Sequence, residues 1–378
     1  MLAKRPDICA HIRKLTVRPN YYLSWPTRDE TLRETWVAHM IENISGDLVL
    51  LDTFDWDGLE MPQDNLFPPL EDLPAELCVM LIERSPDLEE LSISARWQKL
   101  HSLTLGSFGY MRDFTLGAAD AASFSEFLEC HPTLRYIRLQ WNFKRWMSPT
   151  QVPMHLSPNA LPELDTFVGI YQQVSELPNR KTIETLDLTC EPLHEERLGI
   201  ICPILRTLTS LVSLDLWTHL LYPNQDNTRF FFSILSSCPG LIDLHFMCTM
   251  TFTTKPLQQL ISQLHLLPAL KRFSLTKGHK YGDETMLESA LRILRSKPTL
   301  QQINIRWARE KAPNHLKQEG TYDITTNDAG EPLYLMVHEQ GIPIVGRPFD
   351  REYKFSMPQP AVNSATRKAG KLARVLNM

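Results

Sequence analysis

Apolar residues recur along the chain in short groups of the form L-x-x-L-x-L. Residues two positions apart point to the same face of an extended strand, so each group predicts a short strand with one buried face. The last four groups begin 30, 29 and 30 residues apart, which indicates an internal repeat. The clear groups are Leu88/Leu91/Ile93, Leu100/Leu103/Leu105, Leu134/Ile137/Leu139, Ile183/Leu186/Leu188, Leu211/Leu214/Leu216, Leu241/Leu244/Phe246, Leu270/Phe273/Leu275 and Leu300/Ile303/Ile305. Weaker members are Ile12/Leu15/Val17, Leu48/Leu51/Phe54 and Leu164/Phe167.

A helical pattern precedes the strands. Apolar residues spaced i, i+3, i+4 and i+7 predict an amphipathic helix, as in Phe231/Ile234/Leu235/Cys238 and Leu257/Leu260/Ile261/Leu264. A P-x-L phrase then leads into the strand, and we expect its proline to end each helix. These prolines are Pro86, Pro132, Pro162, Pro239, Pro268 and Pro298.

A strand and a helix repeated about every 30 residues bury their apolar faces only when copies stack. The pattern therefore predicts an α/β leucine-rich-repeat solenoid, a horseshoe with a parallel inner sheet and outer helices. The alternative is a doubly wound α/β domain, which favours longer Val/Ile-rich strands and commonly a Gly-rich first turn. We expect the solenoid over residues 1–310, with irregular units over 1–75.

The pattern changes after Trp307. Residues 322–339 alternate apolar and polar side chains around Asp328 and Gly330, which predicts a β-hairpin. We expect a C-terminal cap over 311–357. Residues 358–378 form a basic tail, either a flexible terminus or an interaction segment.

Composition narrows the function. Leucine supplies 56 of 378 residues, which reflects the repeat, whereas glycine supplies only 15. Glycine-rich phosphate loops and the G-x-S-x-G nucleophile motif are absent from the sequence. The net charge of −5 argues against nucleic-acid or anionic-membrane binding. We expect no enzyme activity, no metal and no cofactor.

Compartment signals are few. Residues 1–8 lack the apolar core of a secretory leader, and no apolar stretch has the length of a membrane span. The seven scattered cysteines favour reduced thiols. We expect a cytoplasmic or nuclear monomer.

Recognition would lie on the concave face of the solenoid. Residues that alternate with the buried apolar positions point to the opposite, exposed face of the sheet, and its aromatic and arginine side chains are typical binding anchors. The acidic members are flanked by basic ones, which favours a partner of complementary charge; the alternative is a polar face that only maintains solubility. The predicted partner-binding residues are Tyr136, Arg138, Gln140, Asp187, Asp215, Trp217, Asp243, His245, Met247, Arg272, Ser274, Gln302, Asn304 and Arg306.

The two ends of the chain resemble a known family. LAKRPDICAHIRKLTVRPN at residues 2–20, TYDITTNDAGEPLYLMVHEQG at 321–341 and REYKFSMP at 351–358 resemble the leucine-rich-repeat part of fungal F-box proteins. The resemblance implies that the repeats hold a protein substrate of an SCF-type ubiquitin ligase. An F-box would dock on the Skp-type adaptor of that ligase.

The F-box itself is expected to be missing or degenerate, because the LAKRPDICAHIRKL phrase normally follows it and here starts after Met1. One segment is a possible remnant, with Leu73, Pro74, Glu76 and Leu77 in the L-P-x-E-L opening. Two functions follow. The chain is either a non-enzymatic substrate-recognition module or a stand-alone scaffold or inhibitor without a ubiquitin link.

Overall fold

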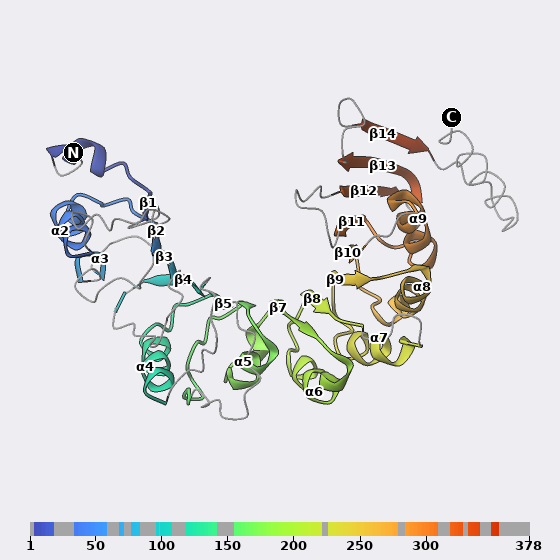
Figure 1. Cartoon of the computed structure of the whole chain (residues 1–378), viewed down its shortest axis with the longest axis horizontal. Coiled ribbons are helices and arrows are strands. Elements are labelled where there is room, and N and C mark those ends of the chain that lie inside the picture. Colours follow the sequence, from blue (N-terminus) through green and yellow to red (C-terminus); the bar gives the residue numbers. More distant parts are fainter. Residues whose placement is uncertain are drawn as a thin grey trace, which may run out of the picture. The chain divides into compact units, whose positions relative to one another are not determined.

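The structure is a computed structural model of the whole chain (Figure 1). It describes residues 4–18, 34–58, 68–71, 77–83, 96–97, 99–107, 118–141, 155–220, 226–278, 284–308, 318–327, 332–340 and 349–354. The chain forms two compact units, Met1–Trp217 and Thr218–Met378.

In the first unit, parallel strands follow one another in chain order. The strands are β1 (Lys14–Val17), β2 (Thr53–Gly58), β3 (Leu77–Glu83), β4 (Leu100–Ser107), β5 (Tyr136–Trp141), β6 (Thr166–Val168), β7 (Thr185–Leu193) and β8 (Ser213–Thr218). The helices are α1 (Pro6–Cys9), α2 (Glu34–Ser45), α3 (Pro68–Glu71), α4 (Ala118–Glu129), α5 (Tyr171–Glu176) and α6 (Leu198–Thr207), with 3-10 turns η4 (Arg180–Thr182) and η5 (Glu195–Arg197). Pairing from β1 to β7 is parallel throughout.

The second unit begins in the same way and ends differently. Its helices are α7 (Thr228–Leu235), α8 (Thr254–Ser262) and α9 (Met286–Ser296), with the 3-10 turn η6 (Leu264–Leu266). Its strands are β9 (Asp243–Thr251), β10 (Arg272–Gly278), β11 (Gln302–Ala308), β12 (Gln318–Thr326), β13 (Pro332–Gln340) and β14 (Phe349–Lys354). Strands β9 to β11 are parallel, and β11 to β14 are antiparallel.

The α/β leucine-rich-repeat prediction is confirmed within each unit. Parallel strands in chain order are preceded by helices, and the apolar positions of the repeat form the core. In β10, for example, Phe273 and Leu275 are at most 1% exposed, and Ile303 and Ile305 of β11 are fully buried. The helix-forming residues Leu257, Leu260 and Ile261 are buried as well, so the stacked units supply the apolar environment that one unit lacks.

The P-x-L phrase has a different role from the one expected. Helices α7, α8 and α9 end at Leu235, Ser262 and Ser296, several residues before the proline in two cases. The residue before each proline instead accepts a hydrogen bond from the leucine N–H, at 3.2–3.4 Å for Leu241, Leu270 and Leu300. The proline thus occupies the second position of a β-turn, where its fixed φ is favourable. The turn formed by the P-x-L residues leads the chain into the next strand.

A backbone ladder fixes the register at the start of each strand. In several repeats one backbone carbonyl accepts two consecutive N–H groups of the next repeat, so that the two strands enter the sheet at the same level. In the first unit Arg135 C=O accepts from Asp165 and Thr166 at 3.0 and 2.9 Å. In the second, Lys271 C=O accepts from Gln301 and Gln302 at 2.8 and 3.2 Å.

Several N-terminal and C-terminal elements differ from the sequence interpretation. Strand β3 was not expected as a strand, and it pairs directly with β4. Leu88, Leu91 and Ile93 lie outside the described residues. The expected hairpin is confirmed, because β12 and β13 pair antiparallel on either side of residue 330. Strand β14 was not predicted, and it extends the cap by a third antiparallel strand.

Within the described residues, no helix is both long and apolar enough to cross a membrane. The domain boundaries at 310 and 357 stay predictions.

A buried histidine connects α4 to the start of β4. His131 is 1% exposed, and its Nδ1 donates to the Phe127 carbonyl at 2.7 Å while its Nε2 accepts the Trp97 N–H at 3.0 Å. Only the neutral ring has this donor and acceptor pair. Burial lowers the pKa of His131.

We expect the free energy of unfolding to fall between about pH 7.5 and 5.5. The unfolded chain takes up a proton near the ordinary histidine pKa of about 6.5, whereas the folded chain resists protonation until lower pH, so acid favours unfolding. His131→Leu should cost about 1–3 kcal/mol at pH 7.5 and flatten this pH dependence. Denaturant unfolding at several pH values measures both effects. His265→Gln, at an exposed site, is the control; an unchanged pH slope in His131→Leu would contradict the assignment.

Candidate functional site

The candidate site is the face of the strands, within each unit, that lies opposite the buried repeat positions. It is called here the open face. In the second unit it consists of cross-strand rows of polar side chains from β9 to β12. Strand register aligns Asp243, Arg272, Gln302 and Asp323 in one row and His245, Ser274, Asn304 and Thr321 in the next. Helices α7, α8 and α9 lie on the other side of this sheet (Figure 1). The alternation of the repeat thus places polar side chains where helices do not cover them.

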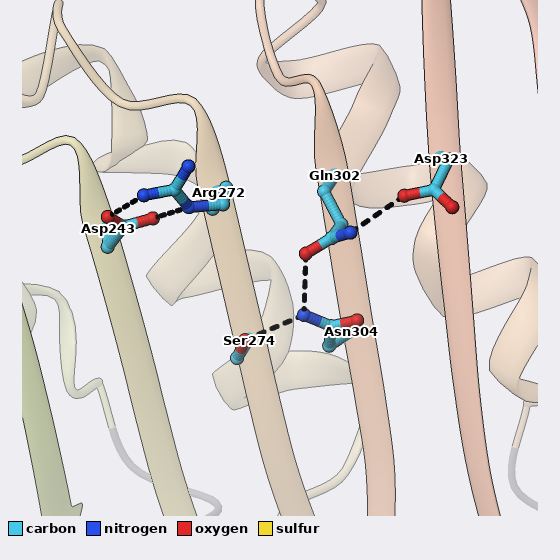
Figure 2. A network of polar contacts seen from close by, with 6 residues as sticks. All are labelled: Asp243, Arg272, Ser274, Gln302, Asn304 and Asp323. Carbon is cyan, nitrogen blue, oxygen red and sulfur yellow. Dashed lines mark hydrogen bonds and ion pairs between the residues drawn. The ribbon is translucent and has the colours of Figure 1, made fainter.

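Amide side chains link the rows into one network (Figure 2). Asn304 Nδ2 donates to Ser274 Oγ and to Gln302 Oε1, both at 3.2 Å. Gln302 Nε2 then donates to Asp323 Oδ1 at 2.7 Å. Next to them, His245 Nε2 and Thr276 Oγ1 lie 3.0 Å apart. His338 Nε2 of β13 lies 3.7 Å from Asp323 Oδ2. Side chains from the five strands β9 to β13 are therefore held in position before a partner binds.

The charged residues of this face are paired with one another. Arg272 forms a bidentate ion pair with Asp243 on the adjacent strand (Figure 2). Arg306 Nη2 lies 2.9 Å from Glu319 Oε1 on β12. The predicted alternation of acidic and basic residues is thus cross-strand ion pairing in the second unit. Arg272 and Arg306 consequently offer a partner less net charge than the sequence indicated.

The first unit positions the remaining predicted residues on its own open face. Tyr136 and Arg138 alternate along β5 and are half-buried, as are Asp187 on β7 and the residues Asp215 and Trp217 on β8. Asp187 Oδ1 accepts from both the N–H and the hydroxyl of Thr189, at 2.8 and 2.6 Å. Gln140 belongs to β5, but its side chain lies outside the described residues, as do Leu73, Pro74 and Glu76.

Leu77 is buried at the first position of β3, and its N–H donates to the Lys99 carbonyl at 3.0 Å. This part of the possible F-box remnant therefore belongs to the repeat sheet.

Sequence reasoning missed some members of the network. Thr276, Glu319, Asp323 and His338 were not among the candidates. Three of them belong to the cap, where the repeat pattern no longer indicates which side chain faces which way. The alternation of polar and apolar residues in the predicted hairpin could have indicated them. That alternation does not predict, however, that β12 pairs with β11.

Cys190 and His194 are of residue types common in catalytic and metal sites, but the structure gives both a structural explanation. Burial raises the pKa of the Cys190 thiol to about 11, so the thiol stays protonated near neutral pH, and it is the thiolate that reacts. His194 directly precedes the turn η5, which leads into α6. Across the described ranges no group of three or more His, Cys, Asp or Glu residues is placed to hold a metal ion.

Comparison with known proteins adds little to this geometry. No family model and no curated protein matches the chain. Among solved structures, the chain is similar to the leucine-rich repeat-containing protein LegL7 from Legionella pneumophila, with 15% sequence identity and a TM-score of 0.45. The similarity covers 79% of this chain and 84% of that one.

The Arg306–Glu319 pair should contribute little to folding. Both side chains are more than 40% exposed, so water and salt screen their attraction. A double-mutant cycle of Arg306→Gln and Glu319→Gln is expected to give a coupling below about 1 kcal/mol that shrinks in 1 M NaCl. Thermal and urea unfolding measure it. A coupling above about 2 kcal/mol, or one insensitive to salt, would mean that the open face is built for stability.

Proposed function

We propose that the chain is a non-enzymatic protein-binding module whose open face holds a protein partner. The observation that carries the proposal is the ordered polar network on β9 to β12, where half-buried side chains are fixed by hydrogen bonds on a face opposite the helices. Binding costs less conformational entropy when the contacting side chains are already held in place.

The hydrogen-bonding capacity left in this network suits a polypeptide. Asn304 uses its amide N–H groups on Ser274 and Gln302, which leaves its Oδ1 able to accept. Ser274 accepts through Oγ, so its hydroxyl proton is available to donate. An acceptor beside a donor on neighbouring strands is complementary to the N–H and C=O of a peptide group. The paired charges around them favour contacts with main-chain groups over strongly charged ones.

The finer assignment rests on family resemblance. We propose that the protein partner is a substrate of an SCF-type ubiquitin ligase, since the two chain ends resemble the repeat region of fungal F-box proteins. Catalysis would then belong to other subunits. A stand-alone scaffold or inhibitor, without a ubiquitin link, is the alternative, and an expected monomer in the cytoplasm or nucleus suits either function.

Removing the network should abolish partner binding and leave the fold intact. The triple variant is His245→Ala, Ser274→Ala, Asn304→Ala. We expect it to recover at least tenfold less of the proteins that co-purify with the wild type, because a loss of about 1.4 kcal/mol in binding free energy weakens binding tenfold. Quantitative mass spectrometry of affinity purifications measures the loss.

The matched control changes the helices instead. Arg229→Ala, Gln258→Ala and Arg295→Ala together alter exposed positions of α7, α8 and α9 and should keep the same partners. Equal retention by both variants, or loss only in the helix variant, would overturn the open-face assignment.

The ubiquitin link predicts adaptor binding. If residues 73–77 act as an F-box remnant, a purified Skp-type adaptor should be retained by the chain, and Leu73→Ala with Pro74→Ala should reduce this retention several-fold. Pull-down with the purified adaptor measures it. No retention by the wild type would favour the stand-alone scaffold.

A further inference from the structure

Arg138 differs from the other basic side chains of the first unit. It lies in the middle of β5, in register with Thr104 on β4 and Val168 on β6, and is half-buried on the open face. Its Nε is buried and has no hydrogen-bond partner among the described residues. Taking the N–H of a charged group out of water without an acceptor is unfavourable. Among the described residues, this donor therefore has no acceptor.

Other basic side chains on or beside the strands of this unit do have acidic partners. Arg135, which precedes the same strand, lies 3.4 Å from Asp165. Three more basic side chains, on or beside β1, pair with aspartates on or next to β2: Arg13 with Asp52, Lys14 with Asp55 and Arg18 with Asp57. These four basic side chains are ion-paired between neighbouring strands, whereas the described residues supply no such pair for Arg138.

The carboxylate in the same row does not take the place of a partner. Strand register aligns Asp187 of β7 with Val168, and Val168 with Arg138. One oxygen of Asp187 already accepts two hydrogen bonds from Thr189, and no ion pair joins Arg138 to Asp187 in the part of the chain that the structure describes. Two strand spacings, about 9.6 Å, separate their positions. Asp187 therefore places a negative charge in the same row, but it does not occupy the hydrogen-bond donors of the Arg138 guanidinium.

Residues with hydroxyl groups lie in the row of Arg138 and in the row before it. Thr104 lies beside it on β4, and Tyr136 precedes it by two positions on β5, where it is in register with Ser102 and Thr166. All four are half-buried. They supply neutral donors and acceptors, and the described residues of these two rows on β4 to β7 include no second cation. A planar guanidinium with hydroxyl neighbours fits one carboxylate, which its fork binds through two N–H groups. A doubly charged phosphate fits less well, because Asp187 repels it and no second cation compensates.

We propose that Arg138 is the anchor for a single Asp or Glu side chain on the protein partner. The proposal rests on the open-face function above and adds the chemistry of the partner: an acidic residue flanked by polar or aromatic residues that contact Tyr136 and the neighbouring hydroxyls. The first unit thus recognises charge, whereas the ion-paired network of the second unit recognises neutral groups.

A phage-displayed random peptide library tests the proposal. It is panned on the wild-type chain, Arg138→Gln, Arg138→Lys and the control Arg135→Gln, which removes an exposed, ion-paired arginine three residues away. We expect the wild type to enrich peptides with Asp or Glu at one fixed position. A synthetic peptide of that sequence should bind Arg138→Gln about 10–100-fold more weakly, bind Arg138→Lys with intermediate affinity and bind Arg135→Gln unchanged.

A change in the peptide gives a test that does not depend on the folding of a variant. Replacing its acidic residue by Asn or Gln should weaken binding to the wild type by the same factor and have no effect on Arg138→Gln. Enriched peptides without an acidic position, or with equal affinity for Arg138→Gln, would overturn the anchor while leaving the open-face function standing. Failure of the wild type to enrich any peptide sequence would count against both.

Discussion

Parallel pairing of short strands is the constraint on which the rest of this structure depends. A single strand of six residues can satisfy neither its backbone groups nor its apolar face. Here the strands obtain both from their neighbours, and paired N–H groups at carbonyls such as those of Arg135 and Lys271 set neighbouring repeats at the same level. With the level fixed, the apolar positions of successive strands stack beneath the helices, and the positions between them are brought into rows on the opposite face. The open face exists because the core is in register.

The same constraint explains how the two units differ in what they offer. In the second unit, complementary residues fall opposite each other, as Asp243 does with Arg272 and Gln302 with Asp323, so their charges and amides are paired before a partner binds. In the first unit, β6 has three residues and places Val168 beside Arg138. An apolar neighbour cannot accept a hydrogen bond, and the described residues provide no other acceptor for the guanidinium Nε. One side chain in a row therefore distinguishes the second unit, whose polar groups pair with one another, from the first unit, where Arg138 can bind a partner.

Two side chains of types common in catalytic sites, Cys190 and His131, serve the fold. Cys190 is kept protonated by burial, and His131 is kept neutral because both ring nitrogens bond to backbone groups. The same desolvation that disfavours charge in these side chains makes an unpartnered arginine costly. Burial costs little for a side chain that can stay neutral, such as Cys190 or His131. For a side chain that stays charged, such as Arg138, burial indicates a binding role.

The sequence by itself determined the strand positions, the helical pattern, the hairpin of the cap and the alternation that gives Arg138, Asp243 or Asn304 an exposed face, since all of these follow from periodicities of two and about 3.6 residues. It did not determine strands β3 and β14, nor the function of the P-x-L proline as a turn residue. It could not determine which side chains meet across strands, because pairing depends on register between segments about 30 residues apart. Tertiary structure alone decided that Arg272 and Arg306 are paired and that Arg138 has no partner among the described residues.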